Sequence, residues 1–138
     1  MNKLSMKKLR QFVNKLKYDS NGLIPVIAQD YKDGMVLMVA FMNRESLLMT
    51  LRTGFMCYYS RSRKKLWKKG ETSGNVQQAR QIMVDCDSDC LLFKIKQIGK
   101  AACHTGYRSC FYRKLNPVTS KFSIAGKRVF NPDTVYKK

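Results

Sequence analysis

The chain has 138 residues, the usual length of a single domain, and its hydrophobic fraction of 44% is that of a globular rather than a disordered protein. No stretch approaches the roughly 18 apolar residues of a membrane-spanning helix, and the basic N-terminus lacks the apolar block of a secretion signal. We therefore expect one cytoplasmic domain over residues 1–138, with no membrane partner.

The net charge of +18 arises from 27 basic and 9 acidic residues, and it is spread over both ends and the middle of the chain. A nucleic acid, a phosphorylated small molecule or a solvated basic surface would each account for part of this excess. The five cysteines are an odd number, so they cannot all pair within one chain. In a cytoplasmic protein they are more typical of metal ligands, core residues or nucleophiles.

The first third of the chain predicts a helix followed by a hairpin. Residues 3–17 have apolar residues at the spacing of an amphipathic helix. Residues 23–31 and 35–42 are apolar, β-branched runs, and the Asp33-Gly34 pair between them favours a tight β-hairpin.

A second helix and further strands are expected next. A helix over about 44–53 has Asn43 as a candidate N-cap and Gly54 just past its end. Residues 56–60 read as a strand, and residues 80–98 as two more strands or one long one.

Two segments have no clear periodicity. Residues 61–75 are polar, basic and glycine-rich, which predicts a loop of about fifteen residues, and loops of this length are usually functional or disordered. The segment after Arg113 is basic with little pattern. The expected fold is therefore α+β, a β-rich domain with a few short helices.

The sequence VDCDSDC places three of the nine acidic residues in strict alternation. If this stretch is a strand, Asp85, Asp87 and Asp89 point to one face, and Cys86 and Cys90 to the other. Three carboxylates on one face suit a hard cation such as Mg²⁺, which would offset their repulsion. The alternative is a solvated acidic turn that pairs with nearby lysines.

Thiols elsewhere indicate a second metal. Three thiolates, from Cys86, Cys103 and Cys110, would leave the fourth position of Zn²⁺ open to water, as in catalytic zinc sites. His104, the only histidine, adjoins a candidate ligand and is a candidate proton carrier, although single histidines are often structural. Cys57 and Cys90 lie among apolar residues and are expected to be packing residues.

Five blocks in order, spanning about residues 22–113, resemble the phosphoribosyl-AMP cyclohydrolase family of histidine biosynthesis. The basic extensions on either side have no counterpart in this resemblance, and the segment after Arg113 is too short for the pyrophosphohydrolase domain fused to many relatives. The matching blocks are NGLIPVIAQD, VLMVAFMNRESL, YYSRSRKKLWKKGETSGN, VDCDSDC and AACHTGYRSCFYR.

The resemblance implies two metals and an intertwined homodimer. It assigns Mg²⁺ to the three aspartates of the acidic block. It assigns Zn²⁺ to Cys86, Cys103 and Cys110, with the zinc shared between subunits so that Cys86 meets the other two thiols of the partner chain.

The implied reaction is hydrolysis of the N1–C6 bond of the purine ring of phosphoribosyl-AMP by zinc-bound hydroxide, with His104 carrying the proton. The product is the formimino-aminoimidazole carboxamide intermediate. The two phosphates of this nucleotide substrate call for cations and backbone donors. The candidate substrate-binding residues are Arg61, Arg63, Trp67, Lys68, Lys69, Glu71, Thr72, Ser73 and Arg108.

Two other functions compete with this one. A zinc-stabilised nucleic-acid-binding module would explain the charge of +18 and the aromatic residues among the basic ones. It would not explain three convergent aspartates, which repel a phosphate backbone, so nucleic acid is not the expected partner. A thiol redox protein would need a Cys-x-x-Cys motif, which the sequence lacks.

Overall fold

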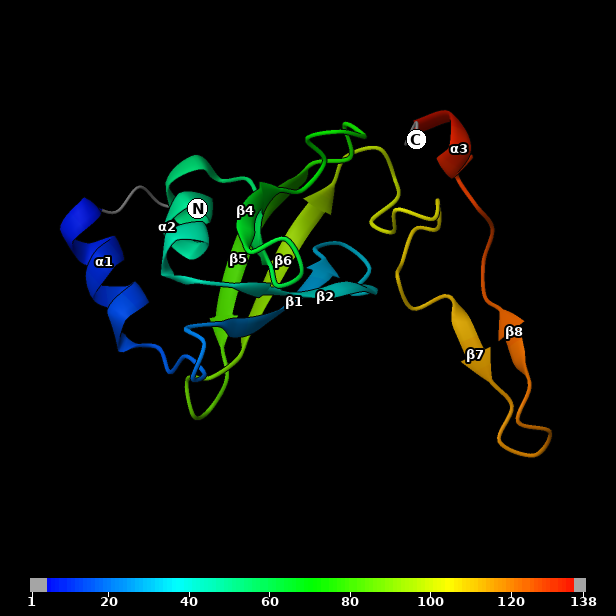
Figure 1. Ribbon diagram of the computed structural model, residues 1–138, viewed down its shortest axis with the longest axis horizontal. Coiled ribbons are helices and arrows are strands. Elements are labelled where there is room, and N and C mark those ends of the chain that lie inside the picture. The colour runs from blue at the N-terminus through cyan, green and yellow to red at the C-terminus, as the bar shows by residue number, and fades with distance from the viewer. Residues whose placement is uncertain (1–4, 136–138) are drawn as a thin grey trace.

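A mixed four-stranded sheet forms the centre of the computed structural model, which describes residues 5–135 (Figure 1). Its strands are β1 (Ile24–Asp30), β2 (Val36–Met42), β5 (Gln77–Val84) and β6 (Leu91–Gln97), in the spatial order β2-β1-β6-β5. The pairs β1–β2 and β5–β6 are antiparallel hairpins, and β1 and β6 join them in parallel. The strands β2 and β5 therefore form opposite edges of the sheet.

The hairpin of β1 and β2 is confirmed, and local residues explain its turn. Gly34 has a positive φ of 78°, and the side chain of Asp33 accepts a hydrogen bond from the backbone N–H of Met35 at 2.9 Å. In the register that follows, Ile24 pairs with Met42. The first residue of the hairpin and its partner are both fully buried.

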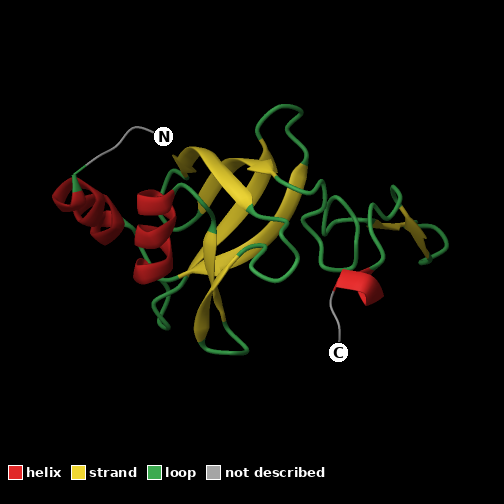
Figure 2. Cartoon of the chain, turned by 90° about the horizontal axis from the view of Figure 1, so that it is seen from above, coloured by secondary structure: helices red, strands yellow, loops and turns green. Residues whose placement is uncertain are grey.

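Two helices lie together at one end of the sheet (Figure 2). The predicted second helix is confirmed as α2 (Arg44–Thr53), with Asn43 and Ser46 exchanging hydrogen bonds as a capping box and Gly54 in the left-handed conformation. The predicted first helix is shorter than expected: α1 spans Met6–Lys15 and is capped by Ser5. Positions 3 and 4 of that prediction lie outside the described residues.

The prediction of one long loop over residues 61–75 is wrong in its first half. Strand β3 (Cys57–Ser60) turns back into β4 (Lys65–Lys68), and the two pair antiparallel. The side chains of Tyr58 and Trp67 are cross-strand partners whose ring centroids lie 5.2 Å apart. This contact pairs residues on different strands, so the basic sequence of β4 alone gave no sign of it.

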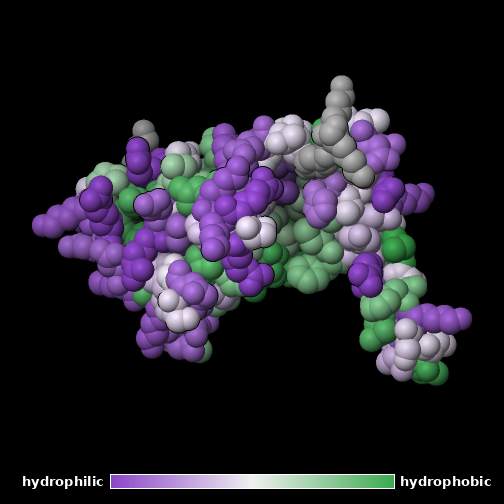
Figure 3. Space-filling model, viewed as in Figure 1, coloured by the Kyte–Doolittle hydropathy of each residue, from purple (hydrophilic) through white to green (hydrophobic). Residues whose placement is uncertain are grey.

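An arm formed by the last described residues projects away from the sheet (Figures 1 and 3). It carries a small hairpin of β7 (Arg113–Leu115) and β8 (Phe122–Ile124) and the short helix α3 (Pro132–Val135), so this segment is more regular than its sequence indicated. Large apolar side chains on the arm are exposed, namely Phe111, Leu115, Val118, Phe122 and Ile124.

The main core lies between the sheet and α2. Its largest fully buried side chains include Tyr58, Phe93, Ile24, Leu37 and Leu47. The expected α+β fold, mostly sheet with short helices, is confirmed, whereas the homodimer stays a prediction. Within residues 5–135, none of the helices has the length and apolar character needed to cross a membrane.

Candidate functional site

A cavity of about 450 Å³ lies between β2, the segment from Arg63 to Ser73, and the residues that follow β6. Seven of the nine predicted substrate-binding residues line it: Arg63, Trp67, Lys68, Lys69, Glu71, Thr72 and Ser73. His104 and Cys110 line the same cavity from the opposite segment. The basic loop, the only histidine and one candidate zinc thiol thus surround a single space.

The contribution of β2 to the cavity lining was not predicted from the sequence. Met38, Val39 and Ala40 line the cavity, although they read only as part of an apolar strand. An apolar wall opposite polar and charged groups is typical of ligand sites, where a few polar groups orient a ligand that is held mainly by its flat faces.

The loop that follows β4 depends on Gly70, because any larger residue there would force the backbone to shift. Gly70 has a φ of 87°, and a Cβ atom there would collide with the backbone of Asn75 and Val76. Downstream, the Gly74 N–H donates to the carbonyl of Gly70 at 2.8 Å, and the Asn75 N–H donates to the hydroxyl of Ser73 at 3.1 Å. The loop therefore closes tightly beside the cavity.

Lys69 is the one charged side chain that is buried among the described residues, with 7% of it exposed. Its ammonium donates to the carbonyl of Ala102. Burial lowers the pKa of Lys69, while the nearby thiols of Cys110 and Cys103 act in the opposite direction. A buried cation without a carboxylate partner favours an anionic group in the adjacent space.

The thiols of Cys103 and Cys110 lie close together. Although Cys110 as a residue is exposed, protein atoms around its sulfur raise its pKa to about 12, and the charge of Cys103 adds to the shift. The Cys103 sulfur is 2.8 Å from the hydroxyl of Thr105. A thiol with a raised pKa, such as that of Cys110, stays protonated at neutral pH unless a metal displaces the proton. Two adjacent thiols provide the sulfur ligands that a soft cation such as Zn²⁺ prefers.

Cys86 lies far from that pair within the same chain. It is exposed in the turn between β5 and β6, whereas the N–H of Cys110 donates to the carbonyl of Leu37 on β2 at 2.7 Å. The strands β2 and β5 are opposite edges of the sheet, separated by three strand spacings, roughly 14 Å. Zinc–sulfur bonds are about 2.3 Å long, so one zinc ion cannot bind all three thiols of a single chain.

The three aspartates converge, as expected, but they do so in a turn and not on one face of a strand. Their carboxylate oxygens lie within 4.8 Å of one another. Residues 85–90 form a turn rather than a strand, so the predicted alternation of faces is wrong. The side chain of Asp85 accepts from the N–H groups of Asp89 at 3.0 Å and Cys90 at 3.2 Å, and Ser88 adopts a positive φ of 64°. These bonds curl the segment and gather the carboxylates at its tip.

Crowding of the carboxylates changes their acidity. Hydrogen bonding with Asp87 and Asp85, together with their negative charges, raises the pKa of Asp89 to about 6. The cluster is exposed, which suits a hydrated cation such as Mg²⁺ that keeps several of its waters.

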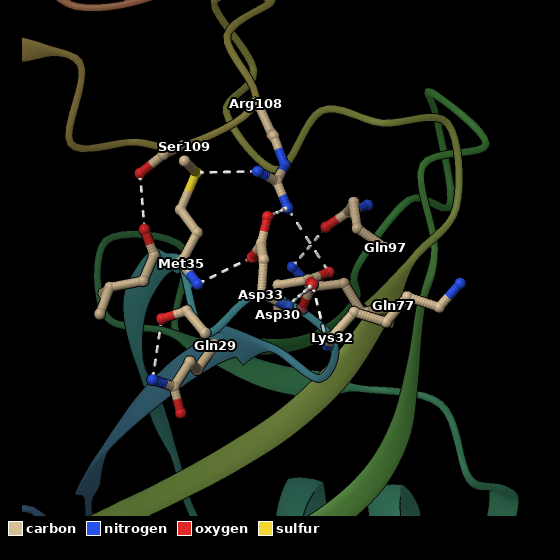
Figure 4. Close-up of polar contacts among 11 residues, drawn as sticks. Gln29, Asp30, Lys32, Asp33, Met35, Gln77, Gln97, Arg108 and Ser109 are labelled. Carbon is tan, nitrogen blue, oxygen red and sulfur yellow. Dashed lines mark hydrogen bonds and ion pairs between the residues drawn. The ribbon is translucent and has the colours of Figure 1, made fainter.

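Two predicted substrate contacts lie outside the cavity lining. The guanidinium of Arg61 stacks on the ring of Phe41 at 4.1 Å. That of Arg108 lies 2.8 Å from a carboxylate oxygen of Asp33 and 3.7 Å from one of Asp30 (Figure 4).

Of the remaining thiols, one matches its expected role. Cys57 is buried, with 3% exposed, which confirms it as a packing residue, and burial raises its pKa. Cys90 is only half-buried, so it packs less completely than expected.

Comparison with known proteins gives one consistent result. The family model described as phosphoribosyl-AMP cyclohydrolase matches residues 38–112, which include the cavity loop, the aspartate turn and both paired thiols. Proteins with that name from Chlorobium chlorochromatii and Methanospirillum hungatei are each 53% identical to the chain. The first match covers 97% of this chain and 96% of the relative, and the second covers 89% of each.

The Chlorobium match also corrects one expectation. It spans 134 residues, so most of the two basic end segments do have counterparts in a relative. The same matches favour an enzyme over the nucleic-acid-binding module considered above.

Proposed function

The chain belongs to the phosphoribosyl-AMP cyclohydrolases, hydrolases of histidine biosynthesis, and on this premise we propose that its cavity hydrolyses the N1–C6 bond of the substrate's purine ring. The observation that carries the proposal is the cavity itself, because His104, Cys110 and the basic loop from Arg63 to Ser73 line the same space. A purine nucleotide with two phosphates would meet a flat apolar wall, cations and a proton carrier there.

We propose that zinc binds Cys103 and Cys110 of one chain and Cys86 of the partner subunit. The proximity of the first two thiols and the distance of Cys86 across the sheet support a site shared between chains. When bound, zinc supplies a water that is acidic enough to attack at neutral pH.

A homodimer follows from the shared site. The exposed apolar arm supports it, since Phe111 is 60% exposed and Phe122 is 58% exposed in the single chain. Large apolar side chains gathered on a projecting arm are typical of a surface that another protein chain covers.

The residues of this chain then have separate roles. His104 takes a proton from the attacking water and delivers it to the departing nitrogen. Arg63 and Lys68 bind phosphate, and the backbone around Gly70 adds donors. The aspartate cluster holds Mg²⁺, which offsets the repulsion between its three carboxylates.

The proposal is tested by incubating the protein with phosphoribosyl-AMP and following the imidazole product, with and without a zinc chelator. We expect turnover that the chelator abolishes and added zinc restores. Cys103→Ser and Cys110→Ser should lose both zinc and turnover, whereas the matched control Cys90→Ser should keep both. Turnover that survives full removal of zinc would refute the proposed metal chemistry.

A further inference from the structure

Residues 98–112, the thiol segment, carry Cys103 and Cys110 between β6 and β7. This segment contains no helix or named strand, so its shape depends on contacts made by its loops. The Ala102 N–H donates to the carbonyl of Arg108 at 2.9 Å, and the Cys103 N–H donates to the carbonyl of Tyr107 at 3.1 Å. These bonds close the segment on itself. They do not attach it to the sheet.

Attachment to the sheet comes from the end of the segment. The hydroxyl of Ser109 donates to the carbonyl of Val36 at 2.8 Å, and the Cys110 N–H donates to that of Leu37 at 2.7 Å. Both acceptors lie at the start of the edge strand β2. These bonds hold Cys110. Cys103 lies earlier in the segment, where the Lys69 ammonium already contacts the carbonyl of Ala102, and a second restraint acts beside that contact.

Arg108 supplies that restraint through two parts of the same residue. Its carbonyl accepts the Ala102 N–H, next to Cys103, while its side chain reaches the turn between β1 and β2 (Figure 4). There the guanidinium lies 2.8 Å from Asp33 and 3.7 Å from Asp30. The turn thus becomes linked to both ends of the thiol segment.

The two aspartates are already oriented for this contact. One oxygen of Asp30 accepts from the N–H groups of Lys32 and Asp33, each at 3.0 Å, and one oxygen of Asp33 accepts from the Met35 N–H at 2.9 Å. The other oxygen of each carboxylate faces Arg108. The Met35 hydrogen bond and then the guanidinium lower the pKa of Asp33, so this carboxylate is charged at neutral pH.

We propose that Arg108 is a positioning residue, which holds Cys103 and Cys110 at the spacing that zinc requires by pairing with Asp33 and Asp30. This inference rests on the proposed zinc site and deepens it. The guanidinium lies beside two carboxylates and is absent from the cavity lining, which favours a positioning role over binding of the substrate phosphates. The effect on chemistry is indirect, through the two thiols.

The test compares Arg108→Gln and Asp33→Asn with a matched control, Arg52→Gln, which removes the same charge from an exposed position in the last turn of α2. Zinc affinity is measured by competition with a colorimetric chelator. We expect both test variants to bind zinc about tenfold more weakly, the usual effect of losing a group that orients metal ligands. The double variant should be no weaker than Arg108→Gln alone, since the two residues act as one pair.

A second measurement does not need the metal. In the metal-free protein, amide hydrogen exchange at residues 102–106 should be faster in Arg108→Gln and Asp33→Asn than in the wild type and the control. Arg108→Lys should restore part of the protection and of the zinc affinity, because an ammonium still pairs with one carboxylate. The KM for phosphoribosyl-AMP should stay near the wild-type value in all of these variants.

Contrary outcomes distinguish a failure of the proposed role of Arg108 from a failure of the proposed zinc site. Unchanged zinc affinity and exchange with a raised KM in Arg108→Gln would overturn the inference and return Arg108 to substrate binding. A wild-type protein that binds no zinc would instead refute the proposed function, while the exchange data would still decide whether Arg108 holds the segment. If Arg108→Gln folds poorly, Asp33→Asn decides alone, because Asn can keep the bond to Met35 that shapes the turn.

Discussion

At the scale of single residues, His104 and Lys69 both line the cavity but differ in their exposure to solvent. Lys69 is buried and donates to the carbonyl of Ala102, whereas His104 is an exposed residue of the cavity lining. An exposed imidazole is accessible to solvent between turnovers, and the ammonium of Lys69 is held in place beside the cavity. This division supports a mobile proton at His104 and electrostatic stabilisation from Lys69.

His104→Asn should lower turnover by about 10²–10⁴, the usual contribution of a general acid or base. Asparagine can form hydrogen bonds but cannot carry a proton near pH 7, so zinc content and KM should change little. Steady-state kinetics together with metal analysis check this. Wild-type turnover in the variant would remove His104 from the mechanism, and loss of zinc would assign it a structural role.

Asp89 predicts a pH dependence of stability in the magnesium-free protein. Its pKa is raised to about 6, whereas in the unfolded chain it would be about 4. The folded state therefore holds this proton more tightly, and the stabilisation present at low pH is lost as the pH rises through about 6. The effect is small because the cluster is exposed to screening by solvent.

The measurement is the melting temperature against pH for the wild type and Asp89→Asn. As the pH rises from about 4 to about 6, the melting temperature of the wild type should fall relative to that of Asp89→Asn. Added Mg²⁺ should reverse this shift in the wild type. Parallel curves without Mg²⁺ would show that the three carboxylates do not interact in solution.

The convergence of three aspartates in a basic chain was predictable from the sequence alone, and their oxygens lie within 4.8 Å of one another. The metal at that cluster and proton transfer by His104 stay predictions. The pairing of Arg108 with Asp33 was not predictable, because it joins distant positions through a turn and a loop, and the same arginine read equally well as a phosphate ligand.

At the scale of elements, the glycine-rich loop after β4 allows a matched comparison. Gly70→Ala should raise the KM for phosphoribosyl-AMP and lower the melting temperature, because the new Cβ collides with the backbone of Asn75 and Val76. Gly74→Ala is the control, since its φ of 79° is similar but nothing lies within 4 Å of its Cβ position. Both substitutions share the cost of a positive φ, so the collision is the difference.

We expect Gly70→Ala to lose clearly more substrate affinity than Gly74→Ala, by about tenfold on the scale of a displaced binding loop. Kinetics and thermal melts of the two variants side by side check this. Equal effects would mean that the conformation of the loop around Gly70 does not shape the site.

Elements with local signals were the predictable ones. Asn43 and Gly54 mark the two ends of α2, and Asp33-Gly34 marks the first hairpin, since caps and tight turns are set by neighbouring residues. Strand β4 was not predictable because its partner β3 decides its structure. The prediction of a strand over the acidic stretch is wrong because alternation of residue types does not reveal the backbone hydrogen bonds of Asp85 that make it a turn.

At the scale of the whole molecule, the sheet separates the two parts of the proposed zinc site, and the arm exposes the apolar surface that a second chain would cover. The α+β class was predictable from the helical spacing of residues 3–17 and from the apolar, β-branched runs, whereas the distance between Cys86 and the paired thiols depends on strand order. Strand order follows from long-range pairing, which the sequence of each strand does not encode separately.

The central claim is that a working site needs thiols from two chains, and subunit mixing tests it most directly. Cys86→Ala and Cys103→Ala proteins, each inactive alone, are dissociated, mixed and reassociated. One site of each heterodimer then has all its ligands, so about a quarter of wild-type turnover should return when random exchange makes half of the dimers mixed. No recovery, with heterodimers demonstrated by differently tagged subunits, would contradict the account, because the site would then not be assembled from thiols of two chains.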